Sequence, residues 1–380
     1  MSNSRSYKTL CVHGGKFNDS LSHGSVTPIF PATSHAYLDM EKITYPRYYN
    51  TPNQEVLAAK IAALEHGEAG LVFASGMAAI STTLLALLRQ GDHAVVQTKL
   101  YGGTTTFINN CFNEFGISFT TTTSLEIEDF QACLQEKTRL IFIETPSNPL
   151  LQITDIAAVA KLATERGIIT VIDNTFASPV NQNPLDLGID IVVHSATKYL
   201  GGHSDICAGA VISNKDFISK ILHRGKNLGG SLNAQTCSLL ERSIKTLALR
   251  MEQHNRNAQA IAEFLDKHAN VQKVYYPGLP SHDGYELAKK QMRGFSGMLS
   301  FELIPSINPV IMQKKLKLIN PSMSLGGVES TICSPTLTSH STLTPKARAE
   351  QGISDNLLRL SVGVEETEDI IHDLKQALDN

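Results

Sequence analysis

Short apolar runs alternate along this chain with stretches whose apolar residues recur at helical spacing. The runs are rich in β-branched residues and apolar on both faces, which is typical of strands buried in a parallel sheet. Such strands are predicted at 71–73, 94–96, 117–122, 140–143, 168–172 and 189–193. Helices are predicted at 55–66, from about Met77, after Gly102-Gly103, at 127–134 and at 156–165. This order predicts an α/β fold in which a mostly parallel, right-handedly connected sheet is covered by helices.

The rest of the chain divides into an arm, a helical spacer and a second alternating series. Residues 1–50 show no hydrophobic periodicity, so we expect them to form an extended arm that gains its order from a partner subunit. A long helical stretch at 233–266 separates the large domain, predicted at 51–247, from a smaller α+β domain at 248–380. In that smaller domain, strands are predicted at 271–275, 298–304 and 357–362, helices at 286–291, 312–318 and from 368, and loops at 319–350.

Composition points to small-molecule partners. The formal net charge of −3 gives no electrostatic reason to expect binding to nucleic acid or to an anionic membrane. Six cysteines are scattered without a C-x-x-C pair, which predicts reduced thiols in a cytoplasmic protein. The N-terminus has no apolar core of the kind that a secretory signal needs, and the uncharged run 71–88 divides into a strand and a helix rather than forming a membrane span.

Chemically useful side chains follow five of the predicted strands. They are Ser75 with Gly76, Tyr101, Glu144, Asp173 and the segment 195–198. Because the carboxyl ends of parallel strands meet at one edge of a sheet, these groups are expected to face one crevice. Lys198 is the central group, since a lysine drawn into such a crevice loses hydration, which lowers its pKa and frees the amine as a nucleophile. Taken alone, Lys198 could equally be an ordinary surface lysine.

The neighbouring groups supply an anion site, an acid and an aromatic face. The turn before Met77 opens a helix whose first N–H groups are unpaired, so it can bind a phosphate, although it could also be a simple helix cap. Asp173 ends a buried strand, where a protonated ring nitrogen would satisfy its charge. Tyr101 could stack on a planar ring or be a core tyrosine. With Lys198, these groups describe a site for pyridoxal 5'-phosphate (PLP), joined to the lysine as a Schiff base.

At this point the chain resembles the trans-sulfuration family, the Cys/Met-metabolism branch of the fold-type I (aspartate-aminotransferase-like) PLP enzymes. The matching motifs run almost from end to end and occur in the family's order. They are Ala74-Ser75-Gly76-Met77, Leu100-Tyr101-Gly102-Gly103-Thr104, Glu144-Thr145-Pro146-Ser147-Asn148-Pro149, Asp173-Asn174-Thr175-Phe176, Ser195-Ala196-Thr197-Lys198-Tyr199-Leu200-Gly201-Gly202-His203-Ser204-Asp205, Tyr276-Pro277-Gly278-Leu279-Pro280-Ser281-His282, Ser324-Leu325-Gly326-Gly327-Val328-Glu329-Ser330 and Arg359-Leu360-Ser361-Val362-Gly363. The resemblance makes 51–247 the PLP-binding domain.

The resemblance also implies a role for each matching residue. Lys198 would hold the cofactor and later move protons, Tyr101 would stack on its ring and help in proton transfer, and Asp173 would pair with the pyridine nitrogen. The residues that would hold the phosphate are Gly76, Met77, Ser195 and Thr197. Those that would bind the substrate are Arg359, which would clamp the α-carboxylate, together with Asn148, Ser324 and Glu329.

Two stretches bear on assembly and selectivity. Tyr45-Pro46-Arg47 matches a Tyr-x-Arg pair that, in this family, binds the phosphate in the neighbouring subunit's site. The resemblance therefore implies that Tyr45 and Arg47 bind the cofactor of a partner subunit. It also implies a homotetramer, built as a dimer of dimers with shared sites. The family then usually continues with a Gly-Asn-Pro-Thr-like run, whereas 48–53 reads Tyr-Tyr-Asn-Thr-Pro-Asn, one residue longer. Methionine γ-lyases typically have cysteine where this chain has Gly103, which counts against that specialisation.

The resemblance favours a PLP-dependent lyase that cleaves the Cγ–S bond of a sulfur amino acid, cystathionine, to give cysteine, 2-oxobutyrate and ammonia. The motifs barely separate it from cystathionine γ-synthase, which joins an O-acyl-homoserine to cysteine, and they leave a β-lyase or a methionine γ-lyase open. A catalytically silent binding protein would have lost Lys198 or Asp173, and both are present. No G-x-G-x-x-G follows a strand and no H-E-x-x-H occurs, so neither a nicotinamide dehydrogenase nor a metal site is expected.

Overall fold

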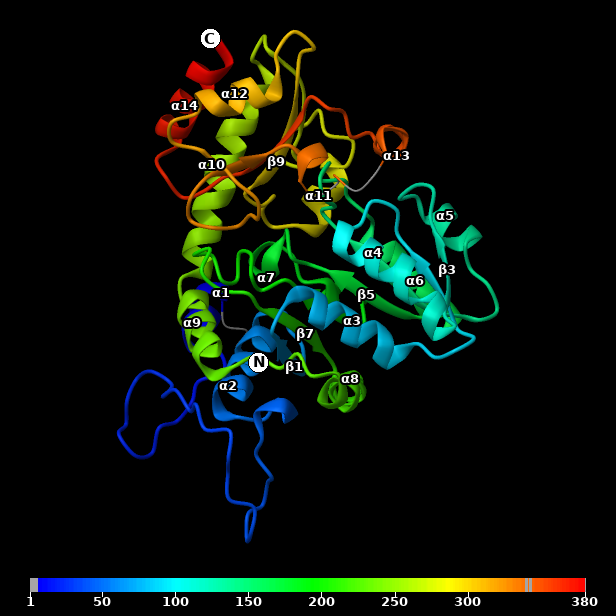
Figure 1. Cartoon of the computed structure of the whole chain (residues 1–380), viewed down its shortest axis with the longest axis vertical. Helices are drawn as coiled ribbons and strands as arrows, with labels where there is room; N and C mark the ends of the chain where they lie inside the picture. The colour runs from blue at the N-terminus through cyan, green and yellow to red at the C-terminus, as the bar shows by residue number, and fades with distance from the viewer. Residues whose placement is uncertain (1–5, 339–340, 342–343, 380) are drawn as a thin grey trace.

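The protein contains two β-sheets, each covered by helices, and an N-terminal segment that projects from the body (Figure 1). The structure is a computed structural model that describes residues 6–338, 341 and 344–379. A seven-stranded sheet has the order β1-β7-β6-β5-β4-β2-β3, and a five-stranded sheet has the order β10-β11-β12-β9-β8. The predicted α/β architecture, with a larger and a smaller sheet, is confirmed.

The seven-stranded sheet is mostly parallel, as predicted. Its strands are β1 (Ala69–Phe73), β2 (His93–Val96), β3 (Ser118–Thr121), β4 (Thr138–Glu144), β5 (Ile169–Asp173), β6 (Ile191–His194) and β7 (Gly209–Ser213). Only β7 runs against its neighbours, because it pairs antiparallel with both β6 and β1. The reversal of β7 restores the direction of β1, so β1 ends at the same edge of the sheet as β2, β4, β5 and β6.

Alternating side chains send each central strand into two cores. Leu140 and Phe142 of β4 pack with α3 (Gly76–Leu87), α4 (Gly102–Cys111) and α8 (Lys215–Leu228). Ile141 and Ile143 pack on the opposite face with α5 (Ile127–Ala132) and α6 (Ile156–Arg166). The continuous apolar runs seen in the sequence are therefore required, because neither face of the sheet reaches water. The helices α2 (Pro52–Leu64) and α9 (Ala234–Ile244) cover the β7 end.

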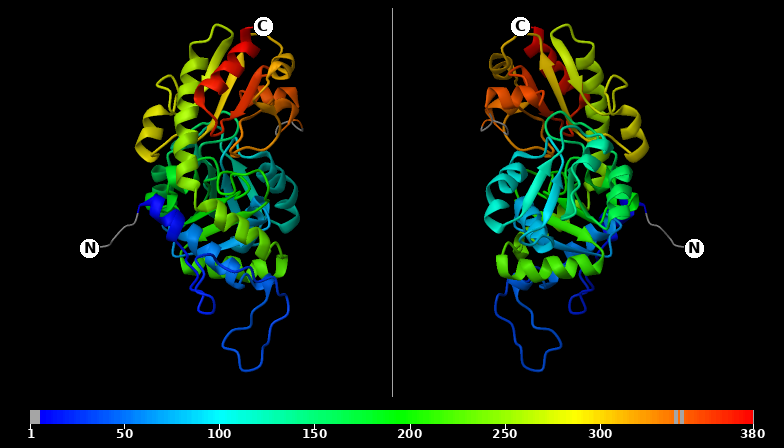
Figure 2. Two further views of the ribbon diagram at one scale, coloured as in Figure 1. Left: turned by 90° about the vertical axis from the view of Figure 1, so that its left-hand side faces the viewer. Right: turned by 90° about the vertical axis from the view of Figure 1, so that its right-hand side faces the viewer.

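The five-stranded sheet lies beyond the first one and is linked to it by α10 (Leu247–Asp266), which packs against α7 (Ser178–Asn181) at one end and β8 at the other (Figures 1 and 2). Its strands are β8 (Val271–Tyr275), β9 (Met298–Leu303), β10 (Asn320–Pro321), β11 (Thr331–Cys333) and β12 (Leu357–Ser361). The remaining helices of this part are α11 (Tyr285–Gln291), α12 (Pro309–Lys315), α13 (Pro345–Glu350) and α14 (Thr367–Asp379). The predicted limit at 247–248 falls at the start of α10, and the domain limits stay predictions.

Four details differ from the sequence prediction. The stretch 233–266 is two helices, because the chain breaks at Thr246, whose hydroxyl donates to the Ser243 carbonyl at 3.2 Å. The helix predicted at 312–318 starts earlier, since Asn308 caps the N–H groups of Val310 and Ile311 and Pro309 occupies the first turn. Neither β7 nor α8 was predicted. The predicted loop region at 319–350 also contains β10, β11 and α13, and residues 339–340 and 342–343 lie outside the described part.

The first 50 residues are only partly an extended arm. Helix α1 (Tyr7–His13) packs against α2 and α10 of its own chain, so this part gains its order without a partner. Beyond it, two loops project from the body (Figure 2). Their exposed apolar side chains include Leu21, at 94% exposure, and Leu38, at 70%. Within the described residues, no helix has the length and apolar character needed to cross a membrane.

Candidate active site

A cavity of about 440 Å³ lies at the carboxyl edge of the seven-stranded sheet. The smaller domain contributes β12 and the loop at 323–325 to its wall. The cavity collects the polar groups that follow β1, β2, β4, β5 and β6. The lining residues are Ser75, Gly76, Met77, Ile80, Tyr101, Gly103, Glu144, Asn148, Asp173, Thr175, Phe176, Ser195, Thr197, Lys198, Cys207, Met323, Ser324, Leu325 and Arg359. The predicted convergence of strand ends on one crevice is therefore present.

Lys198 lies in the cavity wall, four residues after the end of β6. Its Nζ donates a hydrogen bond of 2.8 Å to Oγ of Ser324, a residue with a left-handed φ of 76°. Burial, together with the positive charge of Arg359, lowers the pKa of Lys198 to about 8, while Cys207 opposes the shift. About one tenth of this amine is therefore neutral and nucleophilic at pH 7, against fewer than about one in a thousand for a lysine with the ordinary pKa of about 10.4.

Asp173 and Glu144 are neighbouring acids at the ends of β5 and β4, where the sheet register pairs them directly. Burial raises the pKa of Asp173, and hydrogen bonds from Thr175 act in the opposite sense. Burial and the charge of Asp173 likewise raise the pKa of Glu144. The Glu144 carboxylate is already used, since it accepts from the backbone N–H of Tyr101 at 2.8 Å and of Asn148 at 3.1 Å. Asp173 is thus the acid free to pair with a protonated ring nitrogen.

The N-terminus of α3 forms a cradle of backbone groups in the cavity wall. Ser75 caps the helix by accepting from the N–H of Ala78 at 3.0 Å. At Gly76 an added Cβ would lie 2.7 Å from Cβ of Ser195, so only glycine permits this close approach of the α3 turn to the end of β6. The unpaired N–H groups of Gly76 and Met77 and the helix dipole favour an anion here.

Two flanking residues complete the cradle. The backbone N–H of Ser195 donates to Oγ1 of Thr175 at 2.8 Å, which ties the end of β6 to the end of β5. Thr197 is held by a reciprocal pair of hydrogen bonds with the backbone of Ala208, at 3.1 and 3.0 Å. These bonds fix the loop between β6 and Lys198 before any ligand binds.

Tyr101 stands at the mouth of the cavity with 44% of its surface exposed. It precedes the first residue of α4, and the bond from its N–H to Glu144 anchors its main chain. An added Cβ on Gly103 would lie 2.5 Å from Cε1 of the Tyr101 ring, so the absence of a side chain at Gly103 lets the ring occupy this position. A planar ligand could stack on the exposed face of the phenol.

Arg359, on β12, presents a buried guanidinium to the cavity from above. It donates to Oδ1 of Asn148 at 2.8 Å and to the carbonyl oxygen of Ser324 at 3.3 Å. Within the described residues no carboxylate lies within 4.0 Å of it. A buried cation that has neutral partners is suited to receive a carboxylate from a ligand.

Three of the predicted site residues do not line this cavity. Glu329 lines a neighbouring hollow and accepts a hydrogen bond from Ser204, so the structure does not bring it to the cavity as expected. Tyr45 and Arg47 lie at a turn that packs against α8, where Arg47 lies over the rings of Tyr45 and Tyr48 and donates to the carbonyl of Lys226. Neither lines the cavity of its own chain, and their role in a neighbouring subunit's site stays a prediction.

Several lining residues were not assigned a role from the sequence. They are Ile80, Thr175, Phe176, Cys207, Met323 and Leu325. Thr175 and Phe176 follow the end of β5 directly, so the rule that selected Asp173 could have found them. Cys207 and Met323 lie on connections whose path the sequence does not reveal.

The cavity groups fit PLP. Lys198 can hold its aldehyde, the α3 turn can bind its phosphate, and Asp173 can face its pyridine nitrogen. The fit rests on the cradle at Gly76, which a side chain would fill, and on the buried, unneutralised Asp173 carboxyl.

Comparison with known proteins agrees with this geometry. The chain is 43% identical over 376 residues to cystathionine gamma-lyase of Bacillus subtilis (strain 168), covering 98% of this chain and 99% of the relative. It is also 43% identical over 378 residues to cystathionine beta-lyase of Lactococcus lactis subsp. cremoris (strain MG1363), with coverage of 98% and 99%. The solved structure of cystathionine gamma-lyase from Lactobacillus plantarum complexed with L-serine superposes with a TM-score of 0.95 at 42% identity, covering 99% of both chains.

The family profile described as Cys/Met metabolism PLP-dependent enzyme matches residues 8–379. The chain belongs to this family of PLP-dependent enzymes, and its fold is the α/β fold-type I architecture.

Proposed function

We propose that this protein is a Cγ–S lyase that cleaves cystathionine to cysteine, 2-oxobutyrate and ammonia. The observation that carries the proposal is the arrangement of Lys198, Asp173 and Arg359 around one cavity, in which a lysine of lowered pKa shares the wall with a guanidinium whose hydrogen-bond partners are both neutral. This arrangement suits an α-amino acid, whose carboxylate would bind to Arg359 while its Cα lies near Lys198.

Each group would act at a stated atom of the substrate. Bound PLP withdraws electrons from the substrate's Cα and makes its proton acidic. The amine of Lys198 would take that proton, release it to the bound cofactor and, neutral again, take a second proton from Cβ, because its neutral form is well populated near pH 8. The phenol of Tyr101, at the cavity mouth, would donate a proton to the departing sulfur. Asn148 would hold the Arg359 fork in place through their 2.8 Å hydrogen bond.

The alternatives within the family are a cystathionine β-lyase, a cystathionine γ-synthase and a methionine γ-lyase. The equal identity to a gamma-lyase and a beta-lyase leaves the first of these open. A methionine γ-lyase is disfavoured because such enzymes typically have cysteine at the position of Gly103. In this chain Gly103 lies against the Tyr101 ring, and the ring would have to move to make room for a cysteine side chain.

Product analysis tests the proposal. The purified enzyme with PLP should convert cystathionine to 2-oxobutyrate and cysteine. Coupling to lactate dehydrogenase measures the formation of keto acid, and chromatography distinguishes 2-oxobutyrate from pyruvate. If pyruvate is the main product, the protein is a β-lyase and not a γ-lyase. Faster formation of cystathionine from O-acyl-homoserine and cysteine than its cleavage would establish the synthase instead.

The rate at which the cofactor-free protein takes up PLP is expected to rise with pH through a midpoint near 8. Burial lowers the pKa of Lys198 to about 8, and only the neutral amine attacks an aldehyde, so the reactive fraction grows as pH passes this value and then levels off. An exposed lysine, with a pKa of about 10.4, would give a rate that still increases at about pH 10. Stopped-flow absorbance at a fixed PLP concentration measures the profile.

We further propose a cytoplasmic homotetramer, a dimer of dimers in which Tyr45 and Arg47 bind the phosphate in the partner's cavity. The exposed apolar side chains of the projecting loops support an assembly that covers them. All six cysteines are free thiols, which supports a reducing compartment.

Subunit mixing tests the shared site. Co-refolded Lys198→Ala and Arg47→Ala subunits are expected to regain about one quarter of the wild-type activity, because half of the dimers are hybrids and each hybrid has one complete site. Each variant alone serves as the baseline for the assay of 2-oxobutyrate. If Arg47 served the site of its own chain, no hybrid site would be complete and mixing would restore nothing.

A further inference from the structure

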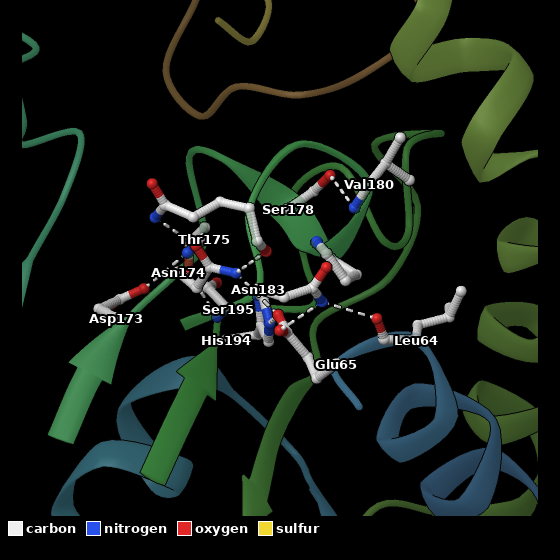
Figure 3. A network of polar contacts seen from close by, with 12 residues as sticks. Leu64, Glu65, Asp173, Asn174, Thr175, Ser178, Val180, Asn183, His194 and Ser195 are labelled. Atoms are coloured by element: carbon white, nitrogen blue, oxygen red, sulfur yellow. Dashed lines mark hydrogen bonds and ion pairs between the residues drawn. The ribbon is translucent and has the colours of Figure 1, made fainter. Parts of the chain in front are cut away.

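A buried carboxylate lies behind the proposed cofactor site and takes no part in the cavity. Glu65, at the end of α2, is 0% exposed, and its Oε1 lies 2.6 Å from Nε2 of His194, which is 1% exposed (Figure 3). The same oxygen accepts from Nδ2 of Asn174 at 2.7 Å. The other oxygen accepts from Nδ2 of Asn183 at 3.2 Å. Glu65 thus connects three separate segments from the inside of the protein.

Asn174 and His194, which contact Glu65, are each next to a residue that lines the cavity. Asn174 follows Asp173 at the end of β5, and His194 precedes Ser195 at the end of β6. Because side chains alternate along a strand, Asp173 and Ser195 face the cavity while Asn174 and His194 face Glu65 on the other side. One carboxylate therefore holds the ends of two strands that carry cofactor-binding groups.

The shortest side-chain contact of Glu65 is with His194. A fully buried carboxylate is costly unless it has partners, and the imidazole lies 2.6 Å from its Oε1. Tyr7 and Arg293 are linked to Glu65 through Asn183, whose Oδ1 accepts from the hydroxyl of Tyr7 at 2.8 Å and from Arg293 at 2.6 Å. Asp186 adds a further negative charge near Tyr7.

We propose that Glu65 and His194 are positioning residues that hold Asp173 in place to face the cofactor's pyridine nitrogen. This inference rests on the role proposed above for Asp173. The positive charge of His194 lowers the pKa of Asp173, against the effect of burial, which raises it. Removal of the Glu65 carboxylate weakens the contacts that it makes with Asn174 and His194 and so loosens both strand ends.

The variant Glu65→Gln keeps the shape and one acceptor atom but removes the charge. We expect kcat to fall by on the order of 10²-fold, with KM changed by less than about threefold, because Arg359 and Asn148 are untouched. The pH midpoint of the visible absorbance band of the bound cofactor should also move upward, since a less well paired pyridine nitrogen withdraws fewer electrons from the group joined to Lys198. A loss of packing alone would not move this midpoint.

Asp373→Asn is the matched control. Asp373 is a buried carboxylate on α14 that accepts from the N–H groups of Lys317, Leu318 and Ile319, at a distance from the cavity. Its variant should lower the melting temperature while the absorbance midpoint and kcat stay at wild-type values. If Glu65→Gln behaves in the same way as Asp373→Asn, the proposal is overturned.

The variant Asp173→Asn tests the role of Asp173 separately from the role of Glu65 and His194. If it leaves the cofactor spectrum unchanged, the proposed role of Asp173 fails; if it moves the midpoint and Glu65→Gln does not, only the role of Glu65 and His194 fails. Should Glu65→Gln not fold, His194→Gln, which keeps a neutral donor beside Glu65, takes its place. An upward midpoint shift in that variant supports the proposal, and a wild-type midpoint with wild-type kcat overturns it.

Discussion

Replacing Lys198 with alanine is expected to lower the rate of 2-oxobutyrate formation from cystathionine by on the order of 10⁴-fold, because the covalent attachment and the proton transfers depend on one amine. Lys198 is the lysine that lines the cavity, and its pKa of about 8 provides the neutral form that both tasks need. Steady-state kinetics with saturating PLP measure the loss. Borohydride reduction followed by peptide mass spectrometry should find the label on Lys198 in the wild type and nowhere in the variant.

Lys60→Met provides the control for burial. Lys60 is also buried, burial also lowers its pKa, and its Nζ donates to the carbonyl groups of Cys11 and Val12 at 3.3 and 3.4 Å. A low pKa without access to the cavity should confer no reactivity toward PLP. The Lys60 variant should therefore keep the label on Lys198 and the wild-type kcat per folded site. Borohydride labelling of another lysine in the wild type would contradict the assignment of Lys198.

The sequence predicts the cavity wall well because strand ends follow a simple local rule. Apolar β-branched runs identify β4, β5 and β6, and the residues at the end of such a run and in the turn that follows it lie at the carboxyl edge of the sheet. This rule places Asp173 and Lys198 in one crevice without any knowledge of their distance. It works even though β7 is reversed, since the reversal returns β1 to the common direction.

Features that depend on contacts between distant segments escape the sequence. Glu65 lies near the end of the helix predicted at 55–66, and only the fold brings it to His194, 129 residues away. Glu329 belongs to the matching motif at 324–330, yet its carboxylate accepts from Ser204 and does not line the cavity. The break between α9 and α10 contains neither glycine nor proline, and the Thr246 hydroxyl that bonds to the Ser243 carbonyl there gives no breaking signal in the sequence.

Replacing Arg359 with alanine is expected to lower kcat/KM for cystathionine by on the order of 10³-fold, because two charge-assisted hydrogen bonds to a carboxylate are lost. The guanidinium is buried, with Asn148 and Ser324 as its partners, so the substrate would supply the charge that it lacks. Arg359→Lys keeps the charge but not the planar fork, and an intermediate loss is expected. The kinetic constants alone do not show which substrate group is affected.

A pair of ligands that differ only in the carboxylate identifies that group. L-Serine and ethanolamine both present an amine to the cofactor, and their dissociation constants follow from the shift of the visible band in a titration. In the wild type, L-serine should bind more tightly than ethanolamine, and in Arg359→Ala this preference should disappear while the affinity for ethanolamine stays within about threefold. Equal weakening of both ligands would show that Arg359 supports the cofactor or the fold. The loss of the preference alone ties the buried guanidinium to the substrate's α-carboxylate.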